Sequence, residues 1–189
     1  RLCGPLCDAI MGIGDQVLSM EEAANSSSTQ SPIPNTQSYS QLIMDQLERA
    51  NLFLVPLDDD RHWYRFHPLF AEVLRSRLAS GASAARVATL HQRASRWFEQ
   101  QRLDVEAIVH ALFAGDQERT ARLIEQCTWP VVYRGQIHTA LGWFDALPAA
   151  FIHTRPTLCV LHALILIHTD QLDAAEARLR EAEQALLPD

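Results

Sequence analysis

The stretch LERANLFLVPLDDDRHWYRFHPLFAEVLRSRL, residues 47–78, decides the fold of the first part of the chain. Within it, an apolar extended run (52–57) is followed by an acidic turn (58–62) and by a segment whose residues alternate in polarity (63–67). Alternation with a period of two is typical of a half-buried β-strand. The sequence therefore predicts a β-hairpin with an acidic turn.

The second strand of this hairpin is expected to present two different faces. Tyr64 and Phe66 share one face, and Arg65 shares the other with Trp63 and His67. The prediction thus places an arginine and a histidine two residues apart on the same side of the strand.

Helices are predicted on both sides of the hairpin. Pro68 suits the first turn of a helix, where no backbone N–H is needed. The helix that it opens carries an apolar stripe made of Leu69, Phe70, Val73, Leu74 and Leu78. Before the hairpin, Ser40 is the expected N-cap of a helix that carries apolar residues on one face, at Ile43, Leu47 and Ala50. Helix, hairpin and helix together look like the later part of a winged helix.

The rest of the chain is predicted to be helical, apart from one polar segment. Residues 25–38 (NSSSTQSPIPNTQS) cannot bury a core and are expected to be mobile. After a short linker at 81–83, the motif LDVEA (103–107) returns as LDAAEA (172–177), which suggests helix pairs that recur about every 34 residues.

The predicted fold class is mainly α: a winged-helix-like unit with a small β-hairpin, followed by tetratricopeptide-like helical repeats. We expect the winged-helix-like domain at 1–80, with the mobile insertion at 25–38, and the helical-repeat domain at 84–189. Because the chain begins at Arg1, inside a predicted helix and without a Met, we expect it to be a piece of a longer protein.

Composition and charge argue against nucleic-acid binding. The chain has 189 residues and a formal net charge of −7, with 48% hydrophobic and 21% charged residues, which is ordinary for a globular protein. A DNA-binding domain usually carries a concentrated basic face, whereas the basic residues here are interleaved with acids. Binding of the DNA backbone by this segment is therefore not expected.

Cysteine usage and apolar runs indicate a cytoplasmic protein. The four cysteines form no CxxC pair, so we expect buried, reduced thiols at Cys3, Cys7, Cys127 and Cys159. The sequence has no recognisable signal peptide, and its longest apolar run (158–167) is far shorter than the roughly 20 residues that a membrane helix needs.

Four stretches of the chain resemble one known family. They are RLCGPLCDAI (1–10), the hairpin stretch (47–78), LHQRASRWFEQQRLDVEAIVHALFAGD (90–116) and RPTLCVLHALILIHTDQLDAAEARL (155–179). They look like the MalT-like, large ATP-binding LuxR-family transcription regulators, within the STAND class of signal-transducing ATPases. The resemblance covers nearly the whole chain except 20–38.

In that family, a nucleotide-binding domain precedes a winged helix, a helical-repeat sensor and a C-terminal helix-turn-helix that binds DNA. The resemblance implies that this chain spans the winged helix and the start of the sensor. ADP would lock the winged helix against the NTPase domain of the same chain. ATP and a small-molecule or protein inducer would favour an open, self-associating form.

Hydrolysis and DNA binding are not expected of this segment itself. The sequence holds neither a GxxxxGK[ST] phosphate loop nor a terminal LuxR-type helix-turn-helix. ATP and ADP are therefore implied only for the parent protein, with no cofactor in this segment, and DNA would be contacted only through the separate C-terminal domain. We predict no catalytic residues and no membrane partner.

His67 is the first candidate functional residue. It precedes Pro68 and is expected at the N-terminus of a helix, where free N–H groups and the helix dipole favour anions. In related NTPases, a His followed by Asp-Leu contacts the β-phosphate of ADP from this position, and His67-Pro68-Leu69 is similar except for the Pro. The alternative is a histidine that merely caps the helix. Arg65 is a second candidate for a phosphate contact, with a solvated arginine as the alternative.

Trp129 and Trp143 are candidates for an effector or partner surface, because they lie near the helix breakers Pro130 and Gly142. In stacked helices most aromatic residues instead belong to the core. The run Asp58 to Asp60 lacks the spacing of a calcium loop and is interpreted as a solvated turn, so no metal site is predicted.

Three other functions compete with the regulatory interpretation. A helical-repeat scaffold for protein partners, with no link to nucleotide, is the main alternative. An enzyme lacks any recognisable catalytic arrangement, and a DNA-reading winged helix is disfavoured by the acidic balance.

Overall fold

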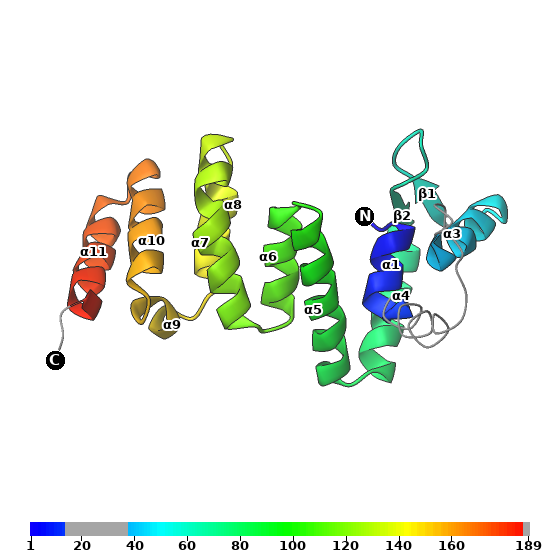
Figure 1. Cartoon of the computed structure of the whole chain (residues 1–189), viewed down its shortest axis with the longest axis horizontal. Helices are drawn as coiled ribbons and strands as arrows, with labels where there is room; N and C mark the ends of the chain where they lie inside the picture. Colours follow the sequence, from blue (N-terminus) through cyan, green and yellow to red (C-terminus); the bar gives the residue numbers. More distant parts are fainter. Residues whose placement is uncertain (14–37, 187–189) are drawn as a thin grey trace, which may run out of the picture. The chain divides into compact units, whose positions relative to one another are not determined.

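The computed structural model describes residues 1–13 and 38–186, and the chain divides into two compact units, Arg1–Trp97 and Phe98–Asp189 (Figure 1). Of the segment predicted to be mobile, 25–38, all but Ser38 lies outside the described residues. The division between the units falls inside helix α5 (Ala84–Gln100), so the predicted domain limits stay a prediction.

The first unit contains the predicted helix–hairpin–helix. Its elements before α5 are α1 (Gly4–Met11), α3 (Tyr39–Arg49), β1 (Leu54–Pro56), β2 (Tyr64–Phe66) and α4 (Pro68–Gly81). The two strands pair antiparallel, with Leu54 opposite Phe66, which confirms the predicted hairpin. Leu2 extends this sheet by one bridge, because its backbone N–H and C=O bond to the C=O and N–H of Tyr64 at 2.9 and 2.8 Å.

The core of the first unit lies between α1, α3 and the hairpin. Its buried centre is Met44, Leu54 and Tyr64, with Leu47 and Phe66 among the half-buried residues packed around it. The crossing of α1 and α3 is close because of Gly4. A Cβ at that position would lie 2.6 Å from the Ser38 hydroxyl and 2.7 Å from the Gln41 Cβ.

Helix α3 begins two residues earlier than the sequence indicated. Ser38, not Ser40, is its N-cap, and its side chain accepts a hydrogen bond from the Gln41 N–H at 3.3 Å. The prediction of Ser40 as the cap is wrong because Asp8 of α1 accepts the Ser40 N–H at 3.0 Å and also binds the Ser38 hydroxyl. The long-range contact with α1 thus fixes where α3 starts.

The second unit is a stack of helices. Those that follow α5 are α6 (Asp104–Phe113), α7 (Gln117–Tyr133), α8 (Ile137–Asp145), α9 (Ala149–His153), α10 (Pro156–His168) and α11 (Leu172–Leu186). Helix α7 packs on α6 and α8, and α10 contacts α7, α8, α9 and α11 (Figure 1). Together with the hairpin, this confirms the mainly α fold class. None of the described helices is long and apolar enough to cross a membrane.

Four connections in the second unit have the same geometry. Each ends its helix with a residue of positive φ, at Arg102, Gly115, Gly135 and Asp170. At each, the N–H of the residue with positive φ donates to the C=O three residues before it. The N–H of the following residue donates to the C=O five residues before itself, which is the pattern of a Schellman cap. Arg102, Gly135 and Asp170 are 33 and 35 residues apart. This spacing is close to the predicted repeat, and the tetratricopeptide-like assignment itself stays a prediction.

Helices α10 and α11 bury apolar residues of different size. Leu161 is buried, but Leu179 is 44% exposed. Helix α11 instead turns Ala175 and Ala182 inward, and Ala175 packs against Ala163 and Leu166 of α10. The small side chains allow α10 and α11 to approach closely, which leaves the larger leucines outside.

Candidate functional site

The junction between β2 and α4 holds the two residues that the sequence singled out. His67 is the N-cap of α4, and Pro68 occupies the first helical turn as predicted. The His67 N–H donates to the Phe53 C=O at 2.7 Å, and the His67 C=O accepts from the Ala71 N–H at 2.9 Å. Backbone bonds on both sides therefore fix the position of His67.

The imidazole of His67 is exposed and makes no capping hydrogen bond to α4. His67 is therefore the N-cap residue of α4 through its backbone, and its side chain adds no bond to the cap. The first turn of α4 holds no acidic residue, so no carboxylate of its own offsets the positive end of the helix dipole. Arg65 is also exposed on β2. This arrangement can attract an anion.

Exposed apolar side chains border the junction. Phe53 stacks on Phe70 with ring centroids 5.1 Å apart, and Phe66 meets Phe70 edge to face at 5.6 Å. Phe53 is 55% exposed and has a φ of 56°, which is rare for a bulky side chain. Leu69 and Val73 of α4 are 69% and 52% exposed. We name the exposed residues Arg65, His67, Phe53, Leu69 and Val73 together the junction face.

A polar cleft of about 440 Å³ lies elsewhere in the first unit, between α3 and the hairpin turn. At its edge the buried Tyr64 hydroxyl lies 3.2 Å from Asp45 and 3.4 Å from Glu48. Burial and these carboxylates raise the pKa of the Tyr64 phenol. Sequence reasoning missed this network. The spacing of Asp45 and Glu48 placed them on one face of α3, but no local signal placed Tyr64 opposite.

The acidic turn of the hairpin is held by one of its own carboxylates. Asp58 accepts hydrogen bonds from the backbone N–H groups of His62 and Trp63, at 2.9 and 3.0 Å. Asp60 lines the polar cleft. Asp58 therefore has a structural role in closing the turn, which fits its interpretation as a loop residue.

The two candidate tryptophans of the helical stack differ in exposure. Trp143 is 3% exposed, so its predicted place on the surface is wrong: it points into the core from the inner side of α8. Trp129 is 44% exposed and stacks on the 82% exposed Tyr133, with ring centroids 5.9 Å apart. Tyr133 was missed, although its spacing of four from Trp129 on one helix could have indicated the pair.

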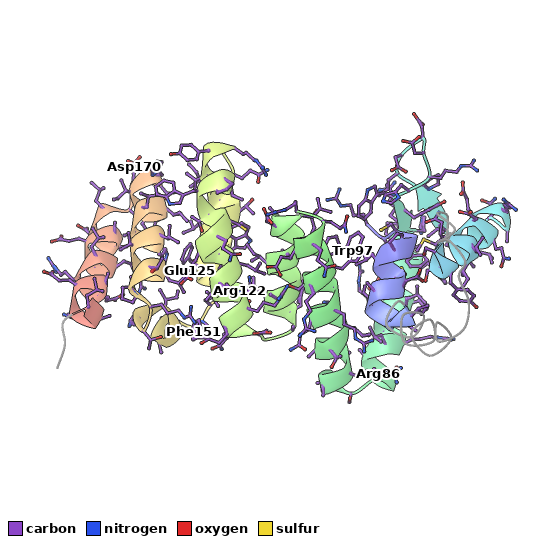
Figure 2. The ribbon with its side chains drawn as sticks, viewed as in Figure 1. Arg86, Trp97, Arg122, Glu125, Phe151 and Asp170 are labelled. Carbon is purple, nitrogen blue, oxygen red and sulfur yellow. The ribbon has the colours of Figure 1, made fainter. Side chains whose placement is uncertain are left out.

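Ion pairs stabilise α7, the helix that carries this aromatic pair. Arg122 and Glu125 project from α7 (Figure 2). Arg122 pairs with Glu99 at 2.9 Å, and Glu125 with Arg155 at 3.5 Å. Each pair therefore joins α7 to a residue outside it, Glu99 or Arg155.

The cysteines are not suited to nucleophilic chemistry. All four are free, and three are buried. Burial raises the pKa of the Cys7 thiol, and that of the Cys127 thiol, to about 11. Since the thiolate is the reactive form, these residues are inert near neutral pH.

Comparison with known proteins finds a family model that matches the first part of the chain, and relatives that match more of it. Residues 1–86 match the family described as the MalT winged helix domain. Over 186 residues the chain is 33% identical to the serine/threonine-protein kinase PknK of Mycobacterium tuberculosis. The aligned region covers 98% of the chain and 14% of the kinase. Over 146 residues it is 30% identical to the HTH-type transcriptional regulator MalT of Yersinia pestis. This aligned region covers 77% of the chain and 16% of the regulator.

The chain thus spans less than one fifth of the length of either relative. No solved structure matches it significantly. The matches include the hairpin and α4, and therefore the junction face. The chain is thus MalT-like, with its residues 1–86 matching the MalT winged helix domain.

Proposed function

We propose that this chain is the relay segment of an ATP-dependent transcription regulator. In this proposal the winged helix docks its junction face on an NTPase domain of the same protein when ADP is bound. The helical stack senses a small-molecule or protein inducer and shifts the protein to an open, self-associating form. DNA is contacted only through a separate domain, and the protein acts in the cytoplasm.

The observation that carries this proposal is the exposed imidazole of His67, which makes no capping hydrogen bond to α4. A histidine fixed by backbone bonds at a helix N-terminus can donate a hydrogen bond to a phosphate without rearranging the backbone. Arg65 on the same strand adds positive charge, and the apolar side chains of the junction face supply area for a domain contact. ATP and ADP would be held mainly by the NTPase domain.

The stacked pair Trp129–Tyr133 is the best candidate for the effector or partner surface. Exposed aromatic side chains supply large contact areas at low entropic cost, and they are enriched in binding interfaces. Trp143 is removed from this candidate surface because it is buried. We propose no catalytic role for the segment: the name of the kinase PknK describes a protein of which only 14% matches this chain.

Inducer-free transcription by the full-length protein tests the proposal. His67→Ala should raise basal transcription per folded molecule, because the phosphate contact exists only in the resting form. His62→Ala removes another exposed histidine of the same unit and should leave basal transcription unchanged. Equal basal transcription in the two variants would contradict the relay role.

A scaffold that binds protein partners without any nucleotide link is the alternative. The exposed apolar residues of the junction face would then serve a partner from another chain. The alternative predicts that ADP does not change the rate of amide hydrogen exchange in the junction face. The relay predicts that ADP protects residues 65–73 in the full-length protein and that ATP with inducer does not.

A further inference from the structure

Two side chains of α5 attach it to other elements of the first unit. Arg93 Nη1 donates to the Ile10 C=O, near the end of α1, at 3.0 Å. Trp97 meets Trp63 edge to face, with ring centroids 6.2 Å apart and an angle of 77° between the rings. Arg93 and Trp97 are four residues apart, so both lie on one face of α5. We name Trp63, Arg93 and Trp97 together the α5 joint.

The hairpin holds the tryptophan that it contributes to the α5 joint. Asp58 accepts the Trp63 N–H at 3.0 Å, and the Trp63 C=O accepts the Leu57 N–H at 2.7 Å. The Arg1 guanidinium lies over the Trp63 ring, 4.8 Å from its centroid, in a cation–π contact. Trp97 therefore packs on a side chain whose backbone is fixed at both its N–H and its C=O.

The attachment of Arg93 depends on a glycine at the end of α1. Gly12 is the C-cap of this helix, and its φ is 75°. A Cβ at Gly12 would lie 2.9 Å from Arg93 Nη1. The carbonyl end of a helix is negative and attracts cations such as a guanidinium. Gly12 thus leaves the space in which Arg93 reaches the Ile10 C=O.

Strand β2 connects the α5 joint to the junction face. Trp63 directly precedes this strand and His67 directly follows it, so the two residues mark its ends. Their even spacing places them on the same face. Pairing with β1 braces β2 along its length, and the His67 N–H donates to the Phe53 C=O at 2.7 Å. A displacement of His67 can therefore reach Trp63 through a paired strand.

Helix α5 continues from the first unit into the second as one helix. Its residues up to Trp97 belong to the first unit, and its last three residues, 98–100, belong to the second. In the second unit, Phe98 is 2% exposed and stacks on His110 with ring centroids 5.2 Å apart. Glu99 pairs with Arg122 at 2.9 Å. Trp97 is thus one peptide bond away from a core residue of the helical stack.

We propose that the α5 joint carries the nucleotide state of the winged helix to the helical stack. This inference rests on the proposed docking of the junction face on an NTPase domain that holds ADP. When a phosphate holds His67, β2 is held, and Trp63 keeps α5 in place. When the phosphate contact is lost, the joint loosens. Because coupling between two sites is reciprocal, a ligand that displaces α5 weakens the retention of ADP.

Amide hydrogen exchange of the full-length protein, with and without saturating ADP, tests this proposal. We expect ADP to slow the opening of residues 88–97 at least about fivefold, the lower end of the usual coupling between two sites. Residues 65–73, measured in the same sample, report on the docking itself. Protection at 65–73 without protection at 88–97 would overturn this inference and leave the proposed function standing. Protection at neither segment would contradict both.

Three variants separate coupling from a merely structural role of the α5 joint. Trp97→Leu and Arg93→Ala should keep the ADP protection of 65–73 and reduce that of 88–97 to less than about twofold. Arg96→Ala removes an exposed arginine of the same helix and should keep both. If Trp97→Leu does not fold, Arg93→Ala, at a half-buried position, gives the result.

A merely structural role predicts a different outcome for these variants. The opening of α5 would then increase by the same factor with and without ADP, because the contacts would stabilise α5 in both states. The ratio of the opening of 88–97 without ADP to that with ADP would stay at its wild-type value. An unchanged ratio in folded Trp97→Leu or Arg93→Ala would contradict the proposal.

Discussion

Helices α4 and α10 have almost the same length and are both rich in apolar residues, but their environments differ completely. Helix α4 has 14 residues and none of them is buried, whereas α10 has 13 residues and buries seven. Helix α10 is apolar all round and contacts four other helices. Helix α4 carries exposed apolar side chains, and the side chain of its N-cap residue, His67, makes no capping hydrogen bond. The comparison teaches that α10 stabilises the fold, while α4 presents its apolar side chains to solvent.

Truncating one leucine in each helix tests this comparison with the largest expected difference in stability. Leu161→Ala in α10 should lower the free energy of unfolding by about 2–5 kcal/mol, because it leaves a cavity in a packed core. Leu69→Ala in α4 should change it by less than about 0.5 kcal/mol, since the side chain is 69% exposed. Urea unfolding of the two variants measures both values. Equal losses would mean that α4 is as well packed as α10.

The first unit should depend on the crossing of α1 and α3 rather than on α4. Gly4→Ala places a Cβ less than 3 Å from three atoms of Ser38 and Gln41, and should destabilise this unit by about 1–3 kcal/mol. Gly81→Ala, at the end of α4, adds a Cβ in open space and is the matched control. Amide hydrogen exchange of α1 and α3, measured for both variants, reports on this unit. A tolerated Gly4→Ala would show that α1 and α3 can move apart freely.

Two turns of the helical stack, after α7 and after α10, sharpen the comparison at smaller scale. Gly135→Ala forces an alanine to adopt a φ near 75° and should cost about 1–2 kcal/mol. Asp170→Gly, at the matching turn after α10, should leave stability unchanged or raise it by up to about 1 kcal/mol. Denaturant midpoints of both variants give these values. If both substitutions changed the free energy of unfolding by the same amount in the same direction, the positive φ would not determine the stability of these two turns.

Ion pairs at the edge of the stack should contribute least. Arg122, with help from Arg119, lowers the pKa of the Glu99 carboxyl. A carboxyl with a lowered pKa contributes stability above its unfolded value of 4.5, and this contribution is lost as the pH falls through the folded value. Glu99→Gln should therefore cost roughly 0.2–1 kcal/mol at neutral pH and almost nothing in strong acid. A cost that does not depend on pH would point to packing instead.

Local signals in the sequence predicted much of the first unit. Alternation at 63–67 predicted β2, and Pro68 predicted the start of α4. The cap of α3 could not be predicted, because Asp8 of another helix decides it. The same holds for Tyr64, whose network depends on which residues of α3 face the hairpin.

In the second unit, periodicity predicted the helices but not which apolar face each one buries. Leu179 and Ala175 are both apolar residues of α11, and only the fit against α10 selects the smaller one. For the same reason Trp143 was expected outside, while Trp129 lies there. Exposure of a single aromatic residue depends on neighbours that are distant in the sequence.

The most direct test of the central claim is the rate at which bound ADP leaves the full-length protein. A charge-assisted hydrogen bond from His67 to a phosphate contributes about 1.5–3 kcal/mol, so His67→Ala should increase this rate roughly tenfold to a hundredfold. The fold should be retained, because the His67 side chain makes no capping bond. An ADP release rate equal to that of the wild type, in a variant that is folded, would contradict the docking of the junction face on bound nucleotide.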